Sequence, residues 1–199
     1  MVFSIRLDKI PGTILDRSDK GVTGKAFLDS VFFLGDGIML TQIREIAGID
    51  GSTLQNWLKR RWVSNPVNKL YTENMLARIL LINMMRDTMR LKDISALLTY
   101  VNGVTESTED DIIPEARLYD YVCETLDRLD AHEGETTQET LTALIADVTA
   151  DYREPVPGAC VRLRHALEVI VLSYYASLII EHFNKTVALI SGTTDPAKP

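Results

Sequence analysis

A short segment, residues 53–61, carries the side chains best suited to recognising another molecule. Its apolar residues recur at the spacing of one helix face, and the others are polar or basic: Thr53, Gln55, Asn56, Lys59 and Arg60. An amide side chain suits adenine, because it can donate to N7 and accept from the N6 amine. Neighbouring positions point about 100° apart on a helix, so we expect at most one of Gln55 and Asn56 to face a base. The chemistry indicated is base reading in the major groove of double-stranded DNA.

Further residues are suited to the phosphates on either side of such a base. Ser52 and Thr53 stand at the expected start of the helix, where hydroxyls and free N–H groups can hold a phosphate. Basic side chains at Lys59, Arg60 and Lys69 would add positive charge along the DNA backbone. The expected DNA-binding set is therefore Ser52, Thr53, Gln55, Asn56, Lys59, Arg60, Lys69 and Tyr71.

Two short helices joined by a tight turn would position these residues. Thr41 is predicted to cap the first helix and Ser52 the second, because a hydroxyl can accept from an unpaired N–H at a helix start. Gly48 suits the reversal between them, since glycine adopts positive φ without steric cost. Residues 62–71 have the size of a small wing hairpin, with Asn68-Lys69 at its turn.

Two longer helices are expected after the wing. Thr72 is predicted to cap a helix from Glu73 to about residue 88. Apolar residues at i, i+3, i+4 and i+7 predict another helix over residues 91–101. Trp57 and Trp62 are assigned to packing, because a buried indole contributes more as core than as a contact.

This order of elements resembles the winged helix-turn-helix DNA-binding domain of MerR-type regulators. The resemblance rests on LTQIREIAGIDGSTLQNW, VNKLYTENMLARILLINMMRD and LKDISALL, which track that pattern across about a third of the chain. Gln55-Asn56-Trp57 stands where such regulators usually carry an arginine-tyrosine-tyrosine run, and Arg90 stands in place of a serine-like cap. The whole chain is also similar to an uncharacterised family of MerR-like proteins from Gram-positive bacteria, known as a domain of unknown function. The resemblance implies a transcription regulator that forms a homodimer through helices after its DNA-binding domain.

The distribution of charge fits a DNA-binding surface within residues 40–103. The whole chain carries a net charge of −7, yet this stretch holds nine basic residues against five acidic ones. Residues 104–154 hold fifteen acidic residues against three basic ones, so we expect them to lie away from DNA. Only charges within about a Debye length, roughly 10 Å, act on a bound phosphate. The net charge of residues 40–103, and not that of the whole chain, is therefore the charge that matters for DNA binding.

The expected fold is all-α, with at most a minimal β wing and a short N-terminal strand. Residues 1–37 would form an arm and a helix that pack on the next domain, and Phe3, Ile5 and Leu7 would alternate as the strand. Residues 38–103 would form the winged helix-turn-helix. Residues 104–192 would form an acidic helical bundle for dimerisation or effector binding, and residues 193–199 a disordered tail.

A long final helix is expected over residues 159–190. Its segment 167–180, LEVIVLSYYASLII, is apolar on nearly every side and must be buried, either by the other helices or by a second copy. The segment is short for a bilayer span, so no membrane contact is expected. A small-molecule effector would be an added role. Tyr119, Tyr121, Tyr174 and Tyr175 would line its pocket, although a place in the core is the favoured interpretation for them.

No enzyme chemistry is indicated. The histidines His132, His165 and His182 lack metal-ligand spacing, and neither a Cys-x-x-Cys pair nor a Gly-rich phosphate loop occurs, so no metal or cofactor is expected. With only two cysteines and no evident signal peptide, a cytoplasmic location is expected. The alternative function is a non-catalytic module that binds a protein through the same helix-turn-helix surface.

Overall fold

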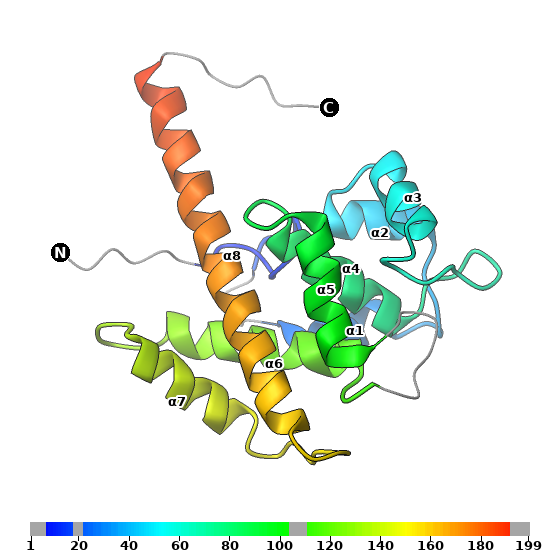
Figure 1. Cartoon of the computed structure of the whole chain (residues 1–199). Helices are drawn as coiled ribbons and strands as arrows, with labels where there is room; N and C mark the ends of the chain where they lie inside the picture. Colours follow the sequence, from blue (N-terminus) through cyan, green and yellow to red (C-terminus); the bar gives the residue numbers. More distant parts are fainter. Residues whose placement is uncertain (1–6, 18–21, 104–110, 192–199) are drawn as a thin grey trace.

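The chain folds into helices throughout the part that the structure, a computed structural model, describes: residues 7–17, 22–103 and 111–191. Within these ranges no strand forms, and three isolated β-bridges are the only extended pairings. The helices are α1 (Gly24–Val31), α2 (Leu40–Ala47), α3 (Gly51–Lys59), α4 (Glu73–Met85), α5 (Leu91–Asn102), α6 (Glu115–Asp130), α7 (Gln138–Val148) and α8 (Ala159–Ile190) (Figure 1). The expected all-α fold is confirmed.

Three expected segments fall largely outside the described ranges. They are the N-terminal strand around residues 3–7, of which only Leu7 is described, the acidic linker over residues 105–111, and the tail over residues 193–199. Leu7 is buried in the core.

The starts of the helices follow the expected capping chemistry in part. Thr72 and Thr137 are N-caps whose hydroxyls accept backbone N–H groups of the first turn, and the prediction for Thr72 is confirmed. Thr41 is not the cap of α2. Met39 holds that position, and its N–H donates to the Oε1 atom of Gln42 at 2.8 Å. The cap was misplaced because a residue reaching back from the first turn satisfies the helix start as well as a hydroxyl does.

One continuous hydrophobic core joins the helices, with α4 at its centre. Nearly every residue of α4 from Met75 onward is buried, because α2, α5, α6 and α8 pack around it. The first helix differs from expectation in its partner. Phe27 and Leu28 of α1 are buried mainly against α6, not against the helix-turn-helix. The N-terminal and C-terminal regions therefore share a core across the expected boundary at residue 103.

A loop over residues 8–16 is tied to three helices. The Nδ2 group of Asn83 donates to the carbonyls of Gly12, at 2.8 Å, and Ala47, at 2.9 Å. The hydroxyl of Tyr119 donates to the Pro11 carbonyl at 2.7 Å. Gly12 adopts φ 76°, and a Cβ atom there would lie 2.6 Å from the carbonyl oxygen of Leu80. The loop is thus held directly against the end of α2.

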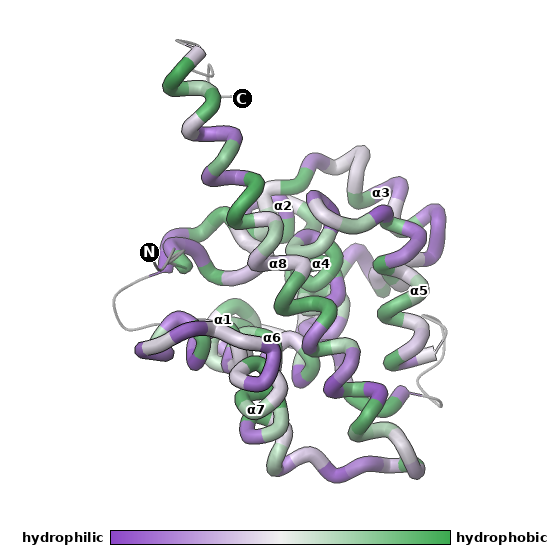
Figure 2. The backbone as a smooth tube through the Cα atoms, turned by 60° about the vertical axis from the view of Figure 1, so that its left-hand side comes forward, coloured by the Kyte–Doolittle hydropathy of each residue, from purple (hydrophilic) through white to green (hydrophobic). Residues whose placement is uncertain are grey.

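The last helix, α8, has two different halves. Its first half is buried against α4, α5, α6 and α7 as far as Tyr174, and its second half projects from the body (Figure 1). Apolar and polar residues alternate along the projecting part (Figure 2). By length and composition alone, α8 is the one helix within the described residues that would be able to cross a membrane.

Candidate nucleic-acid interface

The α2–α3 pair is fixed in place by its apolar sides. Gly48 ends α2 at φ 65°, and its N–H donates to the Arg44 carbonyl at 2.9 Å. The buried residues of the two helices are Ile43, Ile46, Ala47, Leu54, Trp57 and Leu58. Because this side of α3 is anchored in the core, its opposite side faces solvent. Gln55, Asn56, Lys59 and Arg60 are exposed there, as the spacing predicted.

The start of α3 differs from expectation. Asp50 is its N-cap, accepting from the Thr53 N–H at 2.7 Å, whereas Ser52 lies within the first turn. The hydroxyls of Ser52 and Thr53 also donate to the Asp50 carboxylate. These hydrogen bonds hold the pKa of Asp50 well below its usual range, and the one from the Ser52 hydroxyl has the largest effect.

This cap changes what the helix start can bind. An aspartate carboxylate already occupies the position that a phosphate would take, and its negative charge repels a second anion. Ser52 and Thr53 are therefore not placed as a phosphate site in this structure. An aspartate three residues before Thr53 is itself a recognised N-cap pattern, so the sequence did contain this signal.

The two amides on α3 are in different states. The Oδ1 atom of Asn56 accepts from Nε of Arg60 at 3.1 Å, and the Arg60 guanidinium lies 5.2 Å from the centre of the Trp62 ring. The Oδ1 atom of Asn56 can still accept a second hydrogen bond, but the contact with Arg60 restricts the orientation of this side chain. The side chain of Gln55 makes no hydrogen bond within the described part of the chain. Of the two amides, Gln55 is therefore the one without a competing side-chain contact within the described residues.

The loop after α3 ends in a tight turn. Asn68 and Lys69 both adopt positive φ, 52° and 64°, and the Leu70 N–H donates to the Val67 carbonyl at 2.9 Å. Two positive φ values with this hydrogen bond are the features of a type I′ turn. Lys69 is exposed at its tip, and the loop projects on the same side of the molecule as α3 (Figure 1).

Tyr71 does not belong to the exposed set. Only 2% of its surface is accessible, and its backbone pairs with that of Ile38 in both directions, at 2.8 and 3.0 Å. Its aromatic ring is part of the core, where burial raises the pKa of the hydroxyl. The role expected for Tyr71 as a DNA contact is therefore wrong.

Arg78 links the loop after α3 to the C-terminal region, which the sequence did not indicate. Its Nε group donates to the Trp62 carbonyl and its Nη1 group to Glu115, both at 2.6 Å. Both charged side chains are largely buried, at 4% and 14% exposed. One cation therefore joins the base of the loop to the first turn of α6.

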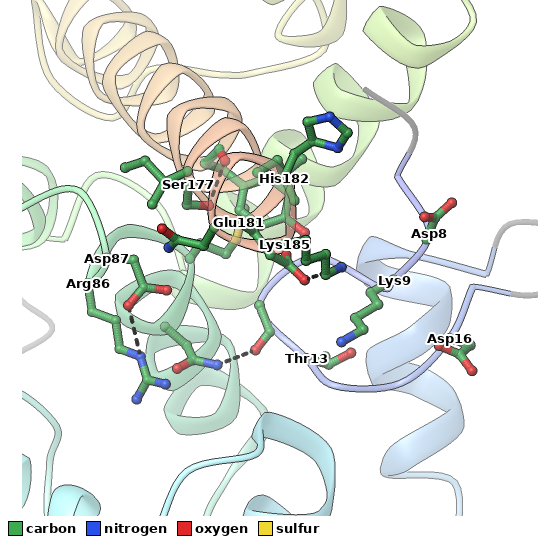
Figure 3. Close-up of a pocket in the computed structure, with 17 residues that line it drawn as sticks. Asp8, Lys9, Thr13, Asp16, Arg86, Asp87, Ser177, Glu181, His182 and Lys185 are labelled. Carbon is green, nitrogen blue, oxygen red and sulfur yellow. Dashed lines mark hydrogen bonds and ion pairs between the residues drawn. The ribbon is translucent and has the colours of Figure 1, made fainter. Parts of the chain in front are cut away.

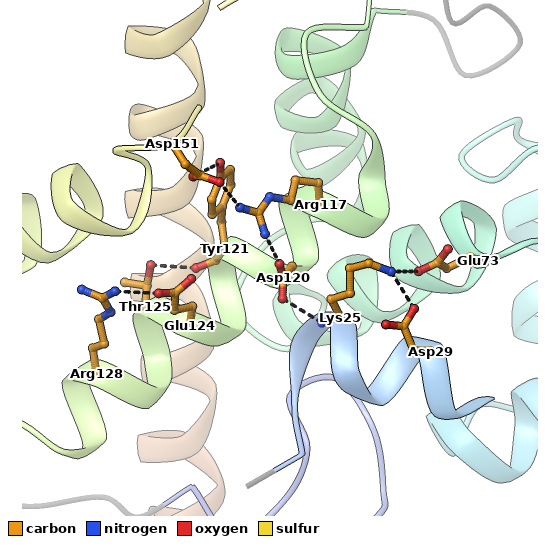
Figure 4. Close-up of polar contacts among 10 residues, drawn as sticks. All are labelled: Lys25, Asp29, Glu73, Arg117, Asp120, Tyr121, Glu124, Thr125, Arg128 and Asp151. Atoms are coloured by element: carbon orange, nitrogen blue, oxygen red, sulfur yellow. Dashed lines mark hydrogen bonds and ion pairs between the residues drawn. The ribbon is translucent and has the colours of Figure 1, made fainter. Parts of the chain in front are cut away.

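A second set of polar contacts joins α1, α4, α6 and the end of α7 (Figure 4). The Lys25 N–H donates to Asp120 at 2.7 Å, and the Lys25 ammonium lies 3.9 Å from Glu73 of α4. Arg117 bridges Asp120 and Asp151. The hydroxyl of Tyr121 donates to Asp151 at 2.7 Å, and burial is the main factor that raises its pKa to about 12. These residues hold the helices together through charged and hydrogen-bonded contacts.

A cavity of about 920 Å³ lies where α8 leaves the body. Its walls are the loop over residues 8–16, the end of α4 and α8 residues 174–185, and Lys9 points toward Thr13 in it (Figure 3). Of the four tyrosines considered for an effector pocket, only Tyr174 lines it. Tyr119 and Tyr121 are buried in the core, and Tyr175 packs partly against it. Among the described residues, no three His, Cys, Asp or Glu side chains are placed to hold a metal ion.

Just under half of the chain matches a known sequence family. Residues 25–122 match the model of a family described as a domain of unknown function (DUF1836). The match begins in α1 and ends in α6, so it includes the α2–α3 pair and the packing of α1 on α6. The description supports the expected similarity to a family of unknown function and carries no statement about DNA. No curated protein and no solved structure matches the chain.

Proposed function

We propose that the protein is a DNA-binding transcription regulator that places the exposed side of α3 in the major groove. The observation that carries the proposal is the position of Gln55: an unengaged amide next to Lys59, on a helix whose opposite side is anchored by Leu54 and Trp57. A rigid support of this kind holds a reading side chain in one orientation. Base reading requires such an orientation.

The basic residues around α3 would supply the contacts to phosphates. Lys59, Arg60 and Arg61 are exposed at the end of α3, and Lys69 is exposed at the tip of the following turn. Asp50 is the opposing charge at the other end of the helix. We therefore expect the phosphate contacts to come from the C-terminal end of α3 and from the turn, not from the start of the helix.

A protein-binding module is the second candidate, favoured by exposed apolar side chains near the turn. Val67 is 74% exposed and Leu70 is 43% exposed. Gly37 lies against Leu70, and the loop that contains Gly37 also exposes Phe33 and Leu34, at 83% and 95%. These residues would suit an apolar partner surface. Such a surface would leave Gln55 and Lys59 without a role.

The cavity beside α8 is the place that we propose for a small-molecule effector. Its volume lies within the usual range for ligand sites, roughly 300–1,000 Å³. Asn83 and Gly12 in its wall are hydrogen-bonded to each other, and Asn83 is also bonded to the end of α2. A ligand there would contact the loop that supports the helix-turn-helix.

The test is selection of binding sites from fragmented genomic DNA by the full chain, followed by affinity measurements over a range of salt concentrations. Gln55→Ala is expected to relax base preference at one position at a cost of about 1–3 kcal/mol at the selected site. Lys59→Ala is expected to weaken binding to all sequences and to reduce the salt slope by about 1.

Arg153→Ala is the charge-matched control. Arg153 is exposed in the α7–α8 loop, at the opposite end of the molecule from α3 (Figure 1). Loss of DNA affinity in Arg153→Ala equal to that in Lys59→Ala would show that charge alone is responsible. A folded chain that selects no site at low salt would overturn the proposal. The second candidate would be supported if the chain captures a protein partner in a pull-down and Val67→Asp abolishes that capture.

A further inference from the structure

Four charged side chains around the cavity beside α8 form pairs within the chain. Glu181 and Lys185 lie 2.7 Å apart, and Arg86 and Asp87 lie 4.0 Å apart. Both pairs are drawn as dashed lines in Figure 3. Because each of these charges already has an opposite charge beside it, the four residues give no indication of what the cavity binds.

Three other charged side chains in the wall have no partner within the described residues: Asp8, Lys9 and Asp16. Lys9 and Asp16 stand opposite one another in an antiparallel bridge of the loop over residues 8–16. The side chains of directly opposite residues start about 5 Å apart on the same face, so an ammonium and a carboxylate lie close together there. The Lys9 side chain is directed toward Thr13, and Asp16 lies at the edge of the cavity (Figure 3). The loop therefore offers both signs of charge at one place.

A neutral acceptor in the same wall also lacks a donor. The Oδ1 atom of Asn83 is buried and accepts no hydrogen bond within the described residues, although its Nδ2 group donates to Gly12 and Ala47. A buried acceptor without a donor is costly, and a ligand that supplies an N–H group would remove that cost. Met84 and Leu178 add an apolar surface beside this acceptor.

We propose that the cavity binds a free amino acid with an apolar side chain. The carboxylate of the ligand meets the Lys9 ammonium, and its own ammonium meets Asp16 and the Oδ1 atom of Asn83. Its side chain lies against Met84 and Leu178. A simple acid would leave Asp16 and Asn83 unsatisfied, and a simple amine would leave Lys9 unsatisfied. The inference rests on the proposed use of this cavity by an effector, and it does not require DNA binding.

The loop connects this site to the helix-turn-helix. The Ile14 N–H donates to the Ile46 carbonyl at 3.0 Å, and a Cβ atom at Gly48 would overlap the Ile14 side chain. Asn83 bonds both the loop and the end of α2. A ligand that holds the loop and Asn83 in one arrangement is therefore expected to slow hydrogen exchange in residues 40–59.

The test is isothermal titration calorimetry of the full chain in the absence of DNA, with L-leucine as the probe. Isocaproate and isoamylamine are its matched controls, because the first lacks the ammonium group and the second lacks the carboxylate. We expect L-leucine to bind with a Kd of roughly 1 mM or lower, and each control compound to bind at least about tenfold more weakly. Hydrogen exchange with and without L-leucine then measures the effect on the α2–α3 pair.

Variants of the loop locate the binding site. Lys9→Met removes the ammonium and Asp16→Asn the carboxylate, and each is expected to raise the Kd for L-leucine by about tenfold. Arg153→Met removes a positive charge in the α7–α8 loop and is expected to leave the Kd unchanged. All three residues are exposed, so the same thermal transition by circular dichroism is expected for every variant.

The outcomes separate the ligand class from the other proposals. A folded chain that does not bind L-leucine, or a Lys9→Met variant that binds it as tightly as the unchanged chain, would overturn the inference. Isocaproate that binds as tightly as L-leucine would keep the cavity as an effector site but overturn the amino-acid class. Unchanged hydrogen exchange in residues 40–59 would overturn the connection to the helix-turn-helix. A failure to select a DNA site would change none of these results, because no DNA is present.

Discussion

Asp50 places a negative charge at the start of the helix that we propose to enter the DNA groove. Its carboxylate accepts from the Thr53 N–H and from two hydroxyls, so it stabilises α3 while lowering the positive potential of the same surface. The cap and the proposed function therefore act against each other at this residue.

Asp50→Asn is expected to separate the two effects. Asparagine is also a good N-cap, so α3 should persist, while removal of the charge should tighten binding to any DNA sequence. Filter binding at several salt concentrations would measure this, with Glu135→Gln in the exposed α6–α7 loop as the control. Equal or weaker binding by Asp50→Asn would place DNA elsewhere on the molecule.

The same residue predicts a dependence of stability on pH. The pKa of Asp50 is lower in the folded chain than its ordinary value of 3.8. The cap therefore contributes its full stability above about pH 5 and loses it as the pH falls below about 4. Denaturant unfolding at pH 7 and at pH 3 should show a smaller loss for Asp50→Asn than for the unchanged chain.

Removal of the Arg78 guanidinium should lower the free energy of unfolding strongly, because its two acceptors lie in a largely buried position. Arg78→Met would leave Glu115 and the Trp62 carbonyl without their donor in a largely buried position. We expect a loss of about 3–5 kcal/mol in the free energy of unfolding, measured by urea titration. Arg86→Met, at the exposed end of the same helix, is expected to change it by less than about 0.5 kcal/mol.

Single residues were the hardest features to predict. The apolar side of α3 followed from spacing, and Gln55, Lys59 and Arg60 were correctly expected to be exposed. Tyr71 was misassigned because its burial depends on pairing with Ile38, which is distant in the sequence. The Arg78–Glu115 pair was missed for the same reason, since no local pattern indicates which helix a charge will meet.

At the level of elements, the turn at Asn68-Lys69 combines strain with a proposed contact. Lys69 holds φ 64°, a conformation that is costly for a residue with a side chain. Lysine at this position instead of glycine is consistent with a need for its charge.

Lys69→Gly is expected to stabilise the fold and weaken DNA binding at once. Glycine relieves the left-handed strain but loses more entropy on folding, so the net gain should be about 0.5 kcal/mol. The salt slope of DNA binding should fall by about 1. Asn68→Gly relieves the left-handed strain at the neighbouring position without changing the charge. Thermal melts and salt titrations of the two variants would separate the effect of strain on stability from the effect of charge on DNA binding. A weaker DNA complex in Asn68→Gly as well would implicate the shape of the turn.

Elements with a long periodic apolar side were predicted well, whereas short ones were not. The bounds of α8 agree with the expected residues 159–190, because Pro157-Gly158 precede the helix and no Gly or Pro interrupts it. The start of α2 was misjudged at Thr41, because a helix of two turns offers several equivalent caps. The partner of α1 was misjudged because periodicity shows which side is buried but not against what.

At the scale of the whole molecule, the single hydrophobic core predicts that the described helices unfold together in one cooperative transition. Cys123 lies at 0% exposure in α6, and burial raises the pKa of its thiol far above the ordinary value of 9. Cys160 at the start of α8 is partly exposed.

Native-state alkylation is expected to distinguish the two thiols. At pH 8 iodoacetamide should modify Cys160 in the folded chain, and Cys123 only at the rate of global unfolding. Mass spectrometry of the peptides, with and without urea, would measure both rates. Modification of Cys123 as fast as that of Cys160 would show that α6 opens separately from the rest of the core.

The α8 helix runs without a break from the core to its exposed end. Its buried half packs on α4, α5, α6 and α7. A molecule that binds the projecting half would therefore be connected mechanically to α4, the helix at the centre of the core, without touching the body itself.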